Sequence, residues 1–292
     1  MAAPDGPTGP DPPTGVGDAI LVATLAAALL HPPGPVYVVH ALQAAAVAGL
    51  LWPAVRRHPL FWLGLAGMQG AYVGLDWAWA DNHKYLAAYW SLALAVAAAT
   101  PGRGRAAANL AATARLLVGL VMGLAAAWKL LTPDTRDGSF FAFTLLTDDR
   151  FAGRTAWLCG VDAADLAANR AAVETLLSAP TGEGVVLAGA ERVRPLATAL
   201  TWAAAATEGL LAVLFLAPGC HTAWQAARDG LLLAFLAGTY LVAPVPGFGG
   251  LLAVMGAAQT PGPRRRAAFL AALVVLEVFT LAYRYSRAGG GA

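Results

Sequence analysis

The feature that most constrains this chain is a series of long apolar segments that follow one another with short breaks. Nine segments can be delimited: 17–31, 35–52, 59–79, 85–100, 108–131, 195–217, 229–245, 247–260 and 267–285. A membrane-spanning helix needs about 20 mostly apolar residues, within a range of about 17–25. Only 12% of all residues are charged, whereas a soluble domain carries about 25%. We therefore predict an all-α, polytopic transmembrane helical bundle of about eight to nine spans.

The breaks divide the chain into four predicted parts. Residues 1–15 are rich in Pro and Gly and lack the basic stretch of a signal peptide, so we expect a disordered tail. Transmembrane helices 1–5 are expected in 16–131 and helices 6–9 in 195–287, with a loop at 132–194 between them. A Pro- and Gly-rich break leaves open whether 229–260 forms two spans or a re-entrant pair.

The distribution of basic residues predicts the orientation of the chain. Short loops that are rich in Arg and Lys stay cytoplasmic. If nine spans alternate, eight basic residues fall on one side: Arg56, Arg57, Arg103, Arg105, Arg228, Arg264, Arg265 and Arg266. The short loops of the other side carry only Lys84. We predict a multi-pass plasma-membrane protein whose N-terminus is cytoplasmic and whose C-terminus and 132–194 loop are extracytoplasmic.

The long loop contains one segment with a helical pattern. Residues 162–178 read as an amphipathic helix, and Asp162 is a suitable N-cap. Its apolar side chains are expected to face the membrane domain: Leu166, Val173, Leu176 and Leu177. The size of the loop fits a lid or cap.

Ionisable residues inside the apolar segments need an explanation, because each costs roughly 2.5–3.5 kcal/mol at the centre of a bilayer. Arg115, Glu208 and Glu277 fall in the cytoplasmic halves of their segments. The depths of Arg115 and Glu208 match, so we predict a structural ion pair between them. A coupled proton or ion path is the alternative interpretation.

A second group of ionisable residues falls at the outer ends of three segments. It consists of His40, Asp76, Asp81, His83 and Lys129. A lysine at a helix end commonly extends to the interface, and an interfacial histidine is commonly only a hydrogen-bonding partner. Desolvation disfavours the charged form of a lysine, however, and makes it a usable base. The convergence of the group therefore favours a reactive pocket for a lipophilic molecule such as a quinol.

Several classes of function are disfavoured by the sequence. The net charge of +2 is too small to indicate nucleic-acid binding. The two cysteines, Cys159 and Cys220, lie far apart without a CxxC spacing, which argues against thiol–disulfide exchange. We see no ligand set for a metal and no internal repeat of the kind that transporters carry; the broken 243–250 stretch keeps a transporter as a weaker alternative.

Two stretches carry a family resemblance. The first is DNHKYLAAYWSLALA (81–95), with an Asn-His-x-Tyr-Leu core, and the second is ARLLVGLVMGLAAAWKLLTPDTRDGSFFAFTLLTDDRF (114–151). In this order and spacing they resemble the horizontally transferred transmembrane domain family, which includes vitamin K-dependent gamma-carboxylase. The resemblance spans about 16–287, and its specific part is 81–151.

The resemblance implies particular roles for some of these residues. A lysine matching Lys129 is the base that deprotonates reduced vitamin K, and a histidine matching His83 lies in the same site. It implies carboxylase- or epoxidase-like activity on a reduced quinone, without a metal. We expect Asn82, Asp81, Tyr85, His40 and Asp76 to bind the substrate.

A departure from the family keeps a second function open. The carboxylase has a large lumenal region for its protein substrate, whereas only 63 residues of outer loop are present here. The alternative is a non-catalytic membrane partner, of the kind linked to peptide maturation or immunity, that binds a membrane or secreted peptide.

Overall fold

A computed structural model describes residues 15–32, 34–75, 77, 82–178, 184–218, 222–240 and 245–289. These residues form fourteen α-helices and no strand. The helices are α1 (Gly15–Leu30), α2 (Val36–Leu51), α3 (Pro53–Arg56), α4 (Pro59–Leu75), α5 (Asn82–Ala99), α6 (Arg103–Leu131), α7 (Pro133–Arg136), α8 (Ser139–Thr147), α9 (Ala152–Cys159), α10 (Ala163–Ser178), α11 (Ala190–Leu216), α12 (Thr222–Tyr240), α13 (Pro246–Gln259) and α14 (Pro263–Gly289). The all-α prediction is confirmed for the described part of the chain.

Among the described residues, three helices are long and apolar enough to cross a membrane: α6, α11 and the Pro263–Tyr283 part of α14. Shorter apolar stretches lie at Gly17–Leu30 in α1 and Val36–Leu51 in α2. These helices fit a multi-pass membrane protein. Each of the nine predicted apolar segments contains a helix, while the number that crosses the bilayer stays a prediction.

The chain forms two compact units, and each is described by itself. Unit 1 takes the described residues of Met1–Leu117 and Pro246–Ala292, and unit 2 takes those of Val118–Val245.

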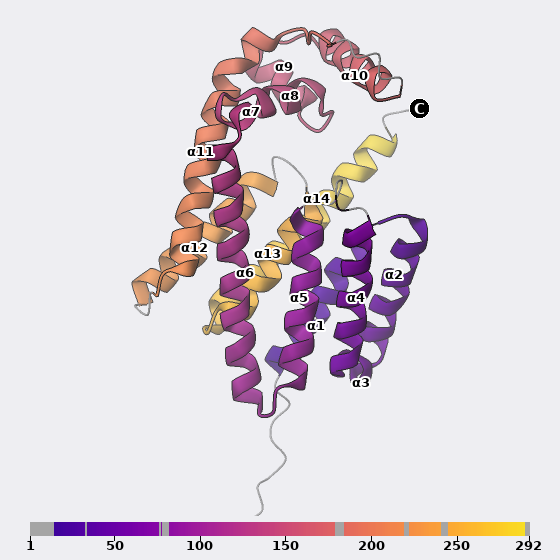
Figure 1. Cartoon of the computed structure of the whole chain (residues 1–292), viewed down its shortest axis with the longest axis vertical. Coiled ribbons are helices and arrows are strands. Elements are labelled where there is room, and N and C mark those ends of the chain that lie inside the picture. The colour runs from indigo at the N-terminus through magenta and orange to yellow at the C-terminus, as the bar shows by residue number, and fades with distance from the viewer. Residues whose placement is uncertain are drawn as a thin grey trace, which may run out of the picture. The chain divides into compact units, whose positions relative to one another are not determined.

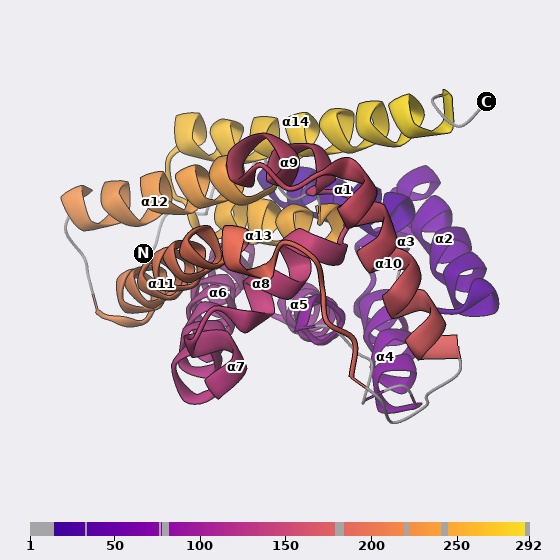
Figure 2. The ribbon, with the colours of Figure 1, turned by 90° about the horizontal axis from the view of Figure 1, so that it is seen from above.

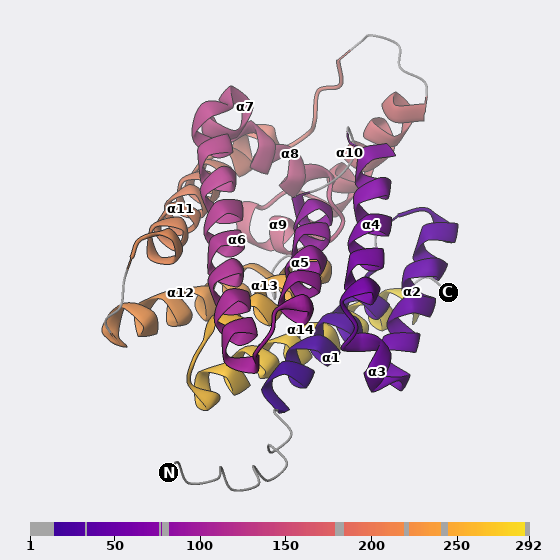
Figure 3. The same cartoon turned by 60° about the horizontal axis from the view of Figure 1, so that its bottom comes forward.

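Unit 1 is built around α13, which is buried on all its faces from Gly249 to Ala257. A helix that is apolar on every side is stable only when other elements surround it, and α1, α5 and α14 pack around this one. Figure 2 shows α13 alongside α14, and Figure 3 shows α4 beside α5. Glycine permits the close approach, because a Cβ atom on Gly256 would lie 2.5 Å from the ring of Phe269.

Unit 2 joins the second half of α6 to α11. A Cβ atom on Gly119 would meet Leu216, and one on Gly209 would meet Ala126. The contacts run in opposite directions along the two helices, so the helices are antiparallel and their second halves overlap. Small residues at such positions let two membrane helices approach closely.

The predicted 132–194 loop is a packed helical cap, formed by α7 to α10 around the first turns of α11 (Figure 1). Its core consists of Leu145, Leu146, Val161, Leu166, Val193 and Ala197. The side-chain amide of Asn169 in α10 donates to the carbonyl oxygen of Ala188 at 3.0 Å and accepts from its backbone N–H at 2.8 Å. Because α11 has 27 residues, it is about 40 Å long and exceeds the roughly 30 Å hydrocarbon core. Its first turns are therefore available to carry the cap.

The predicted amphipathic helix at 162–178 corresponds to α10. The carbonyl oxygen of Asp162 accepts the backbone N–H of Leu166, which puts Asp162 at the N-cap position. Leu166 is buried in the cap core, Val173 and Leu176 are half-buried, and Leu177 is exposed. The inward face is thus narrower than the sequence suggested.

Candidate functional site

An ion pair between Lys129 and Glu208 connects two of the candidate spans within unit 2. The Nζ atom of Lys129 donates to both carboxylate oxygens of Glu208, at 2.9 Å to Oε1 and 2.7 Å to Oε2. Lys129 lies in the last turn of α6 and Glu208 in the second half of α11. The antiparallel overlap of these helices brings the two residues to the same level.

The pair is mostly removed from solvent. The side chain of Lys129 is 15% exposed and that of Glu208 is 11% exposed. Two charges in such a setting stabilise each other strongly, but each alone would carry a large desolvation penalty. The pair is therefore well placed to hold or transfer a proton.

The predicted ion pair between Arg115 and Glu208 stays a prediction, because Arg115 belongs to unit 1 and Glu208 to unit 2. Lys129 occupies both oxygens of Glu208, and no ion pair of Arg115 occurs in the described part of the chain. The depth comparison assumed that the ends of α6 and α11 are level. Within unit 2 the second halves of the two helices overlap, and Glu208 lies against the last turn of α6.

A second buried pair lies in unit 1. Nε2 of His31, at the end of α1, lies 2.6 Å from Oε2 of Glu277 in α14. Glu277 is 9% exposed, and its other carboxylate oxygen has no hydrogen-bond partner among the described residues. A buried carboxylate oxygen without a hydrogen-bond partner is uncommon in folded proteins.

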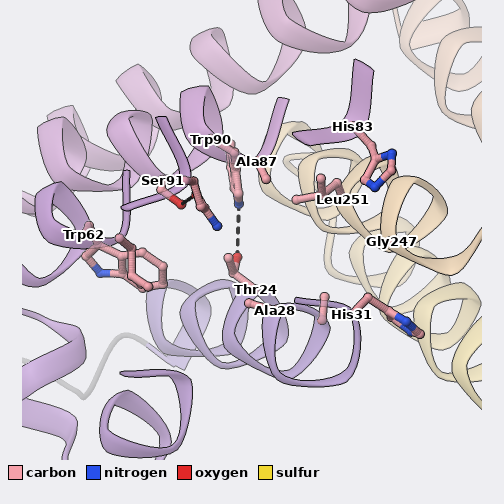
Figure 4. Close-up of a pocket in the computed structure, with 13 residues that line it drawn as sticks. Thr24, Ala28, His31, Trp62, His83, Ala87, Trp90, Ser91, Gly247 and Leu251 are labelled. Carbon is pink, nitrogen blue, oxygen red and sulfur yellow. Dashed lines mark hydrogen bonds between the residues drawn. The ribbon is translucent and has the colours of Figure 1, made fainter. Parts of the chain in front are cut away.

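A small cavity of about 40 Å³ lies next to this pair, between α1, α4, α5 and α13 (Figure 4). Its polar lining comes from Thr24, His31, Gln69, His83, Trp90 and Ser91. The indole N–H of Trp90 donates to Thr24 Oγ1 at 3.1 Å, and the hydroxyl of Ser91 donates to Gln69 Oε1 at 2.8 Å. One buried water needs about 10–15 Å³ by this measure, so the cavity has room for about three waters and is too small for a quinone ring.

A wider groove of about 730 Å³ runs between α2 and α4 at the surface of unit 1. Tyr37, Val38, Met68, Tyr72 and Leu75 are among its lining residues. This volume is in the range of pockets that hold drug-sized ligands. The ammonium group of Lys84 lies 5.4 Å from the centre of the Tyr72 ring, beside the groove.

The predicted outer cluster is placed only in part. His83 lines the small cavity, whereas Asn82 and His40 are exposed. The hydroxyl of Tyr85 donates to the carbonyl oxygen of Trp77 at 3.3 Å. Asp76 and Asp81 lie outside the described residues.

The suggested convergence of His83 with Lys129 stays a prediction. His83 belongs to unit 1 and Lys129 to unit 2. Each side chain is therefore described only within its own unit.

Sequence reasoning missed two arrangements. The sequence analysis did not single out His31, which is the partner of Glu277. Arg228 was counted as a loop residue, but it lies within α12, which begins at Thr222. It is buried, and its Nε atom lies 3.3 Å from Oδ1 of Asp229. A histidine beside a Pro-rich break and an adjacent Arg–Asp pair in an apolar run were the available signals.

No family model, curated protein or solved structure matches the chain. No group of three or more His, Cys, Asp or Glu side chains within the described ranges is arranged to hold a metal ion. The resemblance to the horizontally transferred transmembrane domain family therefore stays a prediction, and any function must be argued from the two buried pairs and the cavities.

Proposed function

We propose that this chain is a multi-pass plasma-membrane protein that transfers a proton from a lipophilic hydroxyl compound, such as a reduced quinone, at the Lys129–Glu208 pair. The contact of Lys129 Nζ with both oxygens of Glu208 carries the proposal. In the proposed orientation the N-terminus is cytoplasmic, about nine spans alternate, and the cap is extracytoplasmic. Carboxylase- or epoxidase-like chemistry at the same site follows from the family resemblance alone.

The pair supplies what a base in an apolar setting needs. Glu208 takes the proton that Lys129 carries, which leaves a neutral amine. The amine then accepts the proton of the substrate hydroxyl: the O–H bond breaks, an N–H bond forms, and the resulting ammonium group neutralises the substrate oxyanion. A positioned base of this kind contributes about 10²–10⁴-fold to a rate.

The surroundings of Lys129 suit an apolar substrate. Its neighbours Trp128, Leu130 and Leu131 are exposed on α6. In a candidate span, exposed apolar side chains face lipid, where a quinone dissolves.

The test uses the purified protein in lipid nanodiscs with a reduced quinone in air-saturated buffer. Dissolved oxygen accepts the two electrons of the deprotonated quinol, and the oxidation is followed by absorbance. Lys129→Arg retains the positive charge but cannot provide a neutral base, because arginine stays protonated. The chain has one other lysine, Lys84, so Lys84→Arg is the matched control. We expect the oxidation rate to fall by about 100-fold or more in Lys129→Arg and to be unchanged in Lys84→Arg. Equal rates for wild type and Lys129→Arg, or no oxidation by wild type, would contradict the proposal.

A non-catalytic membrane partner is the second candidate, and the cap favours it. The cap has its own core, yet it exposes the side chains of Trp157 and Val186. Exposed apolar side chains of this size are typical of a surface that binds another protein. In that case Lys129→Arg retains partner binding, whereas Trp157→Ser in the cap abolishes it, as measured by co-purification of a membrane or secreted peptide.

A further inference from the structure

The small cavity of unit 1 and the His31–Glu277 pair are used by neither proposed function. They are connected through His31, which lines the cavity and also contacts Glu277 through Nε2. Both lie within one compact unit. The arrangement combines a buried acid, a histidine and a polar space of the size of a few waters.

The polar groups around the cavity are arranged for a hydrogen-bonding guest. Gln69 and Ser91 are more than nine-tenths buried. Gln69 accepts the Ser91 hydroxyl through its oxygen, and its amide nitrogen, which lies on the same cavity wall, has no partner among the described residues. Water in the cavity is able to accept a hydrogen bond from this amide N–H. Most of the cavity wall is apolar, and the polar side chains on it give water several hydrogen-bonding partners.

The surroundings of Glu277 contain few charged groups. It lies in the part of α14 that is able to span a membrane, and α13, which packs against α14, contributes no charged residue over Pro246–Gln259. The titratable side chains that line the cavity are His31 from α1 and His83 from α5. Among the described residues His31 is the one group in contact with the carboxylate.

We propose that the cavity holds water and that His31 transfers protons between this water and Glu277, which makes Glu277 a proton-binding site inside the membrane body. A hydronium ion in the cavity gives its proton to Nδ1 of His31. The Nε2–H bond breaks as that proton moves to Oε2 of Glu277, and the imidazole is left neutral in its other tautomer. The hydronium ion becomes water and the carboxylate becomes a neutral acid, so charge and atoms balance.

The test follows the infrared band of a protonated carboxyl group in the full-length protein in lipid. We expect one component of the band to grow as the pH falls, to be lost in Glu277→Gln, and to persist in Glu208→Gln, which removes the carboxylate of Glu208 in unit 2. His31→Phe should retain the band but slow its exchange in D₂O. Persistence of the complete band in Glu277→Gln would overturn the proposal.

Filling the cavity tests the role of water separately. Ala87→Leu and Ala28→Val each add side-chain volume to the cavity wall from a different helix, and Ala99→Leu is the control at an exposed position of α5. We expect hydrogen–deuterium exchange of the carboxyl band to slow by about tenfold or more in each filled variant, because exchange then requires a local opening. The control should exchange at the wild-type rate. Circular dichroism shows whether each cavity-filling variant folds, and a variant that does not fold is left out of the comparison. Exchange at the wild-type rate in every cavity-filling variant that folds would overturn the water-mediated route.

Discussion

Removing one partner of the Lys129–Glu208 pair should lower the free energy of unfolding by far more than the intact pair contributes to it. At 2.7 Å and an effective dielectric constant near 20, the Coulomb attraction is about 6 kcal/mol, opposed by the desolvation of both groups. Lys129→Met leaves a buried carboxylate without its cation, and Glu208→Gln leaves a buried ammonium group without its anion. Because the side chains are 15% and 11% exposed, we expect the lower end of the usual 3–5 kcal/mol, or about 3 kcal/mol for each variant.

The double variant separates an interaction from two independent effects. The double variant Lys129→Met with Glu208→Gln leaves no buried charge at this position. We therefore expect its free energy of unfolding to fall by about 3 kcal/mol or less, in place of the roughly 6 kcal/mol that two independent losses would give. The free energy of unfolding is measured in mixed detergent micelles titrated with SDS, with helix content followed by circular dichroism. Arg115→Met, on the same helix, is the control and should combine additively with Glu208→Gln. Additive losses for the Lys129 pair, or coupling of Glu208 with Arg115, would refute the assignment of partners.

Three further results are expected from single side chains. The backbone N–H of Ser139 donates to the carboxylate of Asp137 and holds its pKa below the usual value of 3.8. This hydrogen bond stabilises the start of α8 at neutral pH, and its contribution is lost as the pH falls below about 3.8. Hydrogen exchange at the Ser139 amide should therefore respond to Asp137→Asn at neutral pH but not in acid. Burial raises the pKa of the Cys159 thiol, so maleimide should label it more slowly than a free thiol at pH 8 and at the normal rate after unfolding. Gly256→Ala should destabilise the protein by about 1–3 kcal/mol through contact with Phe269, whereas Gly64→Ala, with open space around it, should stabilise it by about 0.5–1 kcal/mol.

The helices were predictable because each depends on local sequence. A run of apolar residues bounded by Pro and Gly specifies a helix before any packing occurs, and α2, α5 and α11 therefore begin and end within a few residues of their predicted bounds. The helix α10 followed from the spacing of its apolar residues. Its contacts did not, because Leu177 is turned away from the cap core.

The site was less predictable because its partners are set by the register between helices. Depth along each segment suggested Arg115 for Glu208, whereas the register of the two helices within unit 2 is set by the close packing of Gly119 against Leu216. That register places Lys129 against Glu208. His31 and Glu277 are 246 residues apart, and only the burial of α13 beside α1 and α14 creates their surroundings. No pattern within a single segment contains this information.

All the proposed chemistry depends on α6 crossing the bilayer with the cap outside, and labelling of introduced cysteines measures this directly. In a variant with Cys159 and Cys220 replaced by serine, a cysteine is introduced by Arg105→Cys at the start of α6 or by Glu174→Cys at an exposed position of α10. A membrane-impermeant maleimide applied to intact cells should label the position 174 cysteine at once and the position 105 cysteine only after permeabilisation. Labelling of both positions from the same side would contradict the proposed topology.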